Sequence, residues 1–147
     1  MLTETVDAIV RQYGAGKTVG LLATSGTIKS QVYQDAARRT GLQIIVPGVD
    51  YQALVMDSIY GARGIKAGFT EGICKDQLLL AAEHLCESGA EVLILGCTEL
   101  PLVLEHSKAY MINGHQVALI DPTTLLAIKC IQLSRENLIQ RQSVPAG

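Results

Sequence analysis

The clearest indication of the architecture is a run of four aliphatic residues that ends in a polar turn, Val92-Leu93-Ile94-Leu95 followed by Gly96-Cys97-Thr98-Glu99. An apolar run without polar alternation is typical of a strand covered on both faces, as in a parallel sheet. An earlier run has the same form, because Val19-Gly20-Leu21-Leu22-Ala23 precedes Thr24-Ser25-Gly26-Thr27. Ligands of open α/β sheets bind beyond the carboxyl ends of the strands, so both polar turns are candidate binding loops.

Strand-like and helix-like segments alternate along the rest of the chain. Shorter apolar runs predict further strands over residues 43–46 and 117–120. Apolar residues at helical spacing predict helices over residues 3–13, 28–40, 52–60, 71–88 and 123–140. This alternation predicts a three-layer α/β fold, flavodoxin-like or Rossmann-like, with a mostly parallel four-stranded sheet. We expect a single lobe over residues 1–142 and a disordered tail over residues 143–147.

The composition excludes several classes of protein. Of 147 residues, 48% are apolar and 18% are charged, which excludes an intrinsically disordered chain. A net charge of −2, with five tyrosines and one phenylalanine as the aromatic residues, predicts no nucleic-acid partner. The apolar runs are far shorter than the roughly 20 residues of a membrane span, and the first residues, MLTETVDAIVRQYG, contain no apolar signal-peptide core. We therefore expect a cytoplasmic protein with no membrane partner.

The four cysteines are spread along the chain at positions 74, 86, 97 and 130. They form no C-x-x-C pair and no cluster with histidine, so we expect no metal site. We expect Cys74, Cys86 and Cys130 to be buried structural thiols, since free cysteine behaves as a small hydrophobic residue. Cys97 differs because it follows the most apolar strand directly.

The first polar loop offers the hydroxyls of Thr24, Ser25 and Thr27 at the predicted start of a helix. Free backbone amides and hydroxyls at a helix start can bind an anion. The loop has neither the lysine of a P-loop nor a G-x-G-x-x-G pattern, so a small carboxylate suits it better than a nucleotide. The alternative is that these residues only cap the helix, as serine and threonine often do.

The second polar loop brings a thiol, a hydroxyl and a carboxylate together. A thiol at a helix N-terminus can have its pKa lowered, which raises its thiolate fraction, but the sequence does not fix the pKa of Cys97. Thr98 could donate to a ligand carboxylate, while Glu99 could orient a neighbour or accept a proton. The alternative interpretation is a buried structural thiol beside unrelated polar residues.

Four motifs, in order along the chain, resemble those of the aspartate/glutamate racemase family. They are Val19–Thr27, Ile59-Tyr60 with Ile65-Lys66-Ala67-Gly68, Gly96–Leu102, and Leu119–Thr123. The resemblance implies a cofactor-independent amino-acid racemase, with neither metal nor pyridoxal phosphate, in which two cysteines on opposite faces of the substrate exchange its α-proton.

The resemblance also implies roles for individual residues. Cys97 would be one of the two bases. The substrate-binding set would comprise Thr24, Ser25, Thr27, Lys66, Thr98 and Glu99. Ser25, Thr27 and Thr98 would hold carboxylate oxygens, and Lys66 would pair with a carboxylate or shield developing charge, unless it is simply a solvated surface lysine.

The resemblance covers only the second of the family's two lobes. We therefore expect a homo-oligomer or a complementary first lobe, because the last helix carries apolar residues that would otherwise face water. These are Leu125, Leu126, Ile128, Ile131 and Leu133. The leading function is racemisation of a small amino acid such as aspartate or glutamate. The alternatives are one-base decarboxylation of a small diacid, a non-catalytic lobe that binds a carboxylate or dicarboxylate, and an inactive remnant.

Overall fold

The structure is a computed structural model that describes residues 1–143. The five strands are β1 (Thr18–Leu22), β2 (Gln43–Ile45), β3 (Val92–Leu95), β4 (Ser107–Ile112) and β5 (His115–Ile120). The α-helices are α1 (Leu2–Tyr13), α2 (Ser25–Ser30), α3 (Val32–Ala37), α4 (Val49–Tyr60), α5 (Ile73–Glu87) and α6 (Pro122–Gln142). Two short 3-10 helices are η1 (Ile65–Ala67) and η2 (Leu100–Leu102). Residues 144–147 of the predicted tail lie outside the described residues.

The sheet has the strand order β2-β1-β3-β5-β4. All pairs except the last are parallel, and β4 runs antiparallel to β5 at one edge. The α/β fold with a mostly parallel sheet is confirmed, but the predicted strand number of four is wrong. The missed strand is β4, whose side chains are mostly exposed or half-exposed, so it lacks the continuous apolar run of the buried strands.

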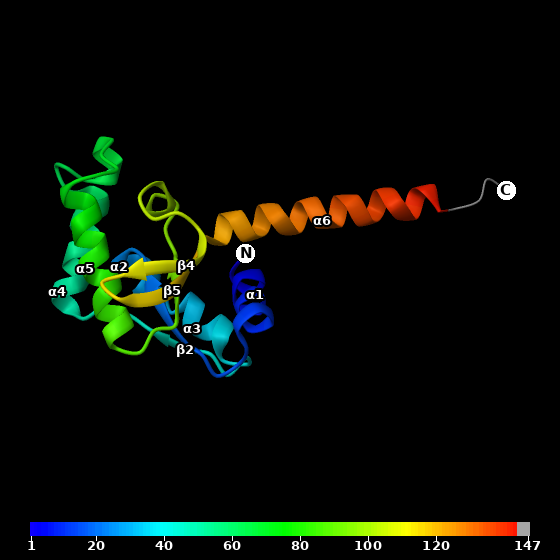
Figure 1. The fold of residues 1–147 in the computed structure, drawn as a ribbon, viewed down its shortest axis with the longest axis horizontal. Helices are drawn as coiled ribbons and strands as arrows, with labels where there is room; N and C mark the ends of the chain where they lie inside the picture. Colours follow the sequence, from blue (N-terminus) through cyan, green and yellow to red (C-terminus); the bar gives the residue numbers. More distant parts are fainter. Residues whose placement is uncertain (144–147) are drawn as a thin grey trace.

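Helices cover both faces of the sheet, as the three-layer prediction requires. Figure 1 shows α4 and α5 on one side of the sheet and α1 and α3 on the other. Each side has its own apolar core. Leu78 and Leu85 of α5 pack with Leu93 and Leu95 of β3 on the first side. On the second side, Ile9 of α1 packs with the residues of β3 whose side chains point to the opposite face of the sheet. The interior strands β1 and β3 are therefore buried on both faces.

The carboxyl ends of β1 and β3 lie next to each other, which brings the two polar loops together. Leu22 pairs with Leu95 in the ladder, and the backbone N–H of Gly96 donates to the carbonyl oxygen of Leu22 at 2.7 Å. A Cβ at Gly96 would lie 2.8 Å from Leu21 Cδ1 and 3.1 Å from Ala23 Cβ. Glycine thus permits the close approach that positions Cys97.

The single helix predicted over residues 28–40 is two short helices, α2 and α3. Gln31 separates them with a left-handed backbone, φ 56° and ψ 20°. The Ser30 hydroxyl donates to the carbonyl oxygen of Thr27 at 2.7 Å and competes with the helical hydrogen bonds at this point. The first helical turn after β1 therefore belongs to a separate element that begins at Ser25.

Helix α6 projects away from the body of the fold (Figure 1). Leu125 in its first turns is buried, so the expectation that this side chain faces water is wrong. The other four apolar side chains named above are exposed, as expected. Cys130 is also exposed, which corrects the prediction that it is buried, whereas Cys74 and Cys86 are buried. Within residues 1–143, no helix combines the length and apolarity needed to cross a membrane.

Candidate active site

Cys97 lies in the loop after β3, where it forms a compact polar group with Glu99 and Lys66. The Cys97 thiol donates a hydrogen bond to Glu99 Oε2 at 2.7 Å. The Thr98 hydroxyl donates to the same oxygen at 3.1 Å. The other carboxylate oxygen, Oε1, lies 3.2 Å from Lys66 Nζ. One carboxylate therefore joins the thiol, the hydroxyl and the ammonium group.

The surroundings of Cys97 keep it protonated. Burial and the hydrogen bond to Glu99 raise the pKa of the Cys97 thiol above its usual value. No helix N-terminus offsets this increase, because η2 is a single 3-10 turn that begins at Leu100, three residues further on. The hydrogen bond from Cys97 and the pair with Lys66 lower the pKa of Glu99 to about 2. At neutral pH the group is therefore a thiol next to a carboxylate.

Lys66 is held in place although its side chain is partly exposed. Its ammonium group lies 5.0 Å from the centre of the Tyr60 ring, in addition to its pair with Glu99. The hydrogen bond with Glu99 is the main reason why the pKa of Lys66 is raised. These contacts argue against a freely solvated lysine. They hold the positive charge of Lys66 beside Glu99 in the Cys97 loop.

The hydroxyl loop after β1 is held by hydrogen bonds within the loop and from α4. Thr24 Oγ1 lies 3.1 Å from Thr27 Oγ1 and accepts the Thr27 backbone N–H at 3.4 Å, so Thr24 caps α2. Ser25 Oγ accepts a hydrogen bond from Gln52 Nε2 at 3.3 Å, and the same amide donates to the carbonyl oxygen of Ala23 at 3.0 Å. Gln52 of α4 is a site residue that sequence reasoning missed, since nothing local relates it to the loop.

A small cavity of about 30 Å³ lies beside the Cys97 loop, where β3 and β5 end. Sequence reasoning did not include two of its lining residues, Tyr33 and Asp121, among the site residues. Asp121 directly follows a buried parallel strand, and this position is the signal that could have found it. Burial, and then the nearby charges of Asp121 and Cys97, raise the pKa of the Tyr33 hydroxyl. Tyr33 is therefore a neutral phenol at this cavity.

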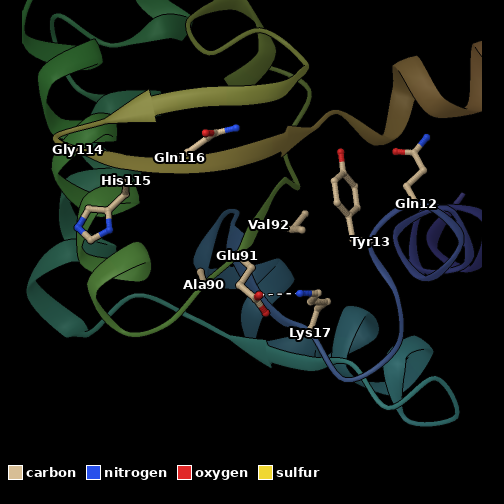
Figure 2. Close-up of a pocket in the computed structure, with 9 residues that line it drawn as sticks. All are labelled: Gln12, Tyr13, Lys17, Ala90, Glu91, Val92, Gly114, His115 and Gln116. Carbon is tan, nitrogen blue, oxygen red and sulfur yellow. Dashed lines mark hydrogen bonds and ion pairs between the residues drawn. The ribbon is translucent and has the colours of Figure 1, made fainter.

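A larger hollow of about 630 Å³ lies at the opposite end of the sheet (Figure 2). Its lining includes Lys17 and Glu91, which precede β1 and β3 and form an ion pair at 2.7 Å, and His115 at the start of β5. None of the predicted site residues lines it. The hollow is open, and Lys17 and Glu91 in its lining already pair with each other, so volume alone does not identify the site. Residues 1–143 also contain no cluster of three or more metal-ligating side chains.

The chain matches the model of a known protein family. The model of the Asp/Glu/Hydantoin racemase family matches residues 1–130. The chain belongs to this family. The predicted resemblance is thus confirmed, and the carboxyl-end loops of this racemase-family chain are its candidate active site.

The chain is also similar to individual curated proteins and solved structures. The chain is 30% identical to a glutamate racemase of Shewanella loihica over 122 residues, which cover 83% of this chain and 43% of that protein. It is 41% identical over 87 residues to an uncharacterized protein of Pectobacterium carotovorum, covering 59% of this chain and 55% of the relative. An aspartate racemase homologue from Pyrococcus horikoshii has the same fold, with a TM-score of 0.70 at 24% identity over 91% of this chain and 55% of that one. The racemase-family chain therefore spans about half the length of these relatives.

Proposed function

We propose that the chain carries half of the active site of an amino-acid racemase of the aspartate/glutamate type that uses neither metal nor pyridoxal phosphate. The supporting observation is the Cys97 thiol hydrogen-bonded to Glu99 at the tip of β3, next to a loop of hydroxyls. In this arrangement Cys97 acts as the acid and base on one face of the substrate. The residues with supporting roles are Thr24, Ser25, Thr27, Lys66, Thr98 and Glu99.

The chemistry follows from the protonation state of Cys97. A base on the opposite face removes the α-proton of the substrate, and the Cα–H electron pair becomes a carbanion delocalised into the carboxylate. The Cys97 thiol then donates its proton to the other face of Cα, and the resulting thiolate regains a proton from solvent. Hydroxyls of Ser25, Thr27 and Thr98 stabilise the carboxylate as negative charge develops on it, and Lys66 supplies a cation. The opposite base is not among the residues assigned here.

Assays of binding and turnover on the same samples test this proposal. We expect calorimetry to detect binding of aspartate or glutamate, and polarimetry to detect slow racemisation of the bound enantiomer. Binding without turnover would favour a non-catalytic carboxylate-binding lobe. If neither enantiomer of either amino acid binds, the proposed function is wrong and an inactive remnant is the better description.

The exposed apolar side chains of α6 lead to a prediction about assembly. Ile131 and Leu133 are about half exposed on a helix that projects into solvent, and such surfaces favour association. We expect light scattering at micromolar concentration to give a mass above the 15.7 kDa of one chain. Ile131→Glu should lower that mass. Gln132→Glu, which adds the same charge at an exposed polar position, should not. A monomer mass for the unmodified chain would contradict the prediction.

A further inference from the structure

Asp121 is a buried acidic side chain without a cationic partner. It is 8% exposed, and no ion pair among residues 1–143 includes it. Its Oδ1 accepts the backbone N–H of Thr123 at 3.0 Å, and its Oδ2 accepts the Thr124 hydroxyl at 2.7 Å. These bonds cap α6 but use only one acceptor position on each oxygen. Buried charges are normally paired, so the remaining acceptor positions suit a cation.

The cavity next to Asp121 has room for such a group. Its volume of about 30 Å³ exceeds the roughly 10–15 Å³ that one water molecule requires, and an ammonium group is similar in size to water. Tyr33, which is 3% exposed, and Cys97 also line the cavity. A cation there would meet a carboxylate and a neutral phenol, both shielded from solvent.

The position of Asp121 relative to the other site residues indicates which cation would occupy the cavity. Parallel strands β1, β3 and β5 are neighbours, and their carboxyl ends carry the hydroxyl loop, Cys97 and Asp121 in that order. An amino acid presents its α-carboxylate, Cα and α-ammonium group around one carbon. With the carboxylate on the hydroxyl loop and Cα at Cys97, the third loop faces the ammonium group. We propose that Asp121 binds the α-ammonium group of the substrate and so selects amino acids over dicarboxylic acids that lack it.

This inference rests on the proposed function, and paired ligands test it separately. Succinate is aspartate without the ammonium group, so calorimetry should show weaker binding of succinate to the unmodified chain. Asp121→Asn keeps a side chain that caps helices well but removes the charge. We expect this variant to bind aspartate at least about tenfold more weakly, a factor equivalent to about 1.4 kcal/mol. Succinate should bind the variant as well as before or more tightly.

Controls separate recognition from a structural role. Asp35→Asn removes the same charge from an exposed position paired with Arg38 and should leave the affinities for both ligands unchanged. A parallel loss of aspartate and succinate binding in Asp121→Asn would assign Asp121 to helix capping alone and overturn the inference, as would no change for either ligand. If the unmodified chain binds neither ligand, the inference and the proposed function both fail. Selective loss of aspartate binding without racemisation by the unmodified chain would support the inference while contradicting the racemase assignment.

Discussion

Replacing Cys97 by alanine is expected to abolish exchange of the substrate α-proton with solvent deuterium. General acid–base groups contribute about 10²- to 10⁴-fold to proton-transfer rates, so the exchange rate should fall by at least about 100-fold. Proton NMR in deuterium oxide measures this directly, because the α-proton signal of aspartate disappears as exchange proceeds. Cys97→Ser should be equally inactive, since a serine hydroxyl is a far weaker acid than a thiol.

Two controls make this result specific to the thiol at residue 97. Cys130→Ala removes an exposed thiol on α6 and should leave the exchange rate unchanged. The Cys97 variants should also retain the thermal unfolding midpoint of the unmodified chain within a few degrees, because the side chain is only partly buried. Undiminished exchange in Cys97→Ala would remove this residue from the proposed chemistry.

The buried strands were predictable because their sequence signal is local. Val19–Leu22 and Val92–Leu95 are continuous apolar runs, and both are interior strands of the sheet. Strand β4 gives no such signal, since its polar and exposed residues acquire their strand conformation from pairing with β5. A local signal for the hairpin nevertheless exists. Asn113 and Gly114, both with positive φ, form the turn between β4 and β5, and an Asn-Gly pair is a strong indicator of such turns.

The candidate site could be predicted as a set of loops but not as an electrostatic arrangement. The loop residues follow strand ends in the sequence, so their gathering at one edge follows from the topology. The protonation state of Cys97 depends instead on burial and on the direction of the Glu99 side chain, which no local pattern encodes. Gln52 illustrates the same limit, because its contact with Ser25 joins residues 27 positions apart. Distances between side chains of different elements therefore had to come from the structure.

Glu99→Gln is expected to lower the pKa of Cys97 and make its thiol more reactive. The Glu99 carboxylate disfavours the thiolate through its negative charge and by accepting the thiol proton in a hydrogen bond. Glutamine keeps the shape but removes the charge, and it leaves Lys66 without its anionic partner near the thiol. A lower pKa gives more thiolate at pH 7. Alkylation of Cys97 by iodoacetamide should therefore become several-fold faster in the variant.

The pH profile of this alkylation distinguishes an effect on ionisation from one on access. The pKa of Glu99 is about 2, so Glu99 stays ionised throughout the measured range, and the inflection of the alkylation rate at alkaline pH reports the ionisation of Cys97. In Glu99→Gln the inflection should move to lower pH, while the limiting rate at high pH stays the same. The measurement uses a Cys130→Ser background, because that exposed thiol would otherwise react as well. A raised limiting rate with an unmoved inflection would mean that Glu99 only shields the thiol, and the carboxylate would then have no part in setting its acidity.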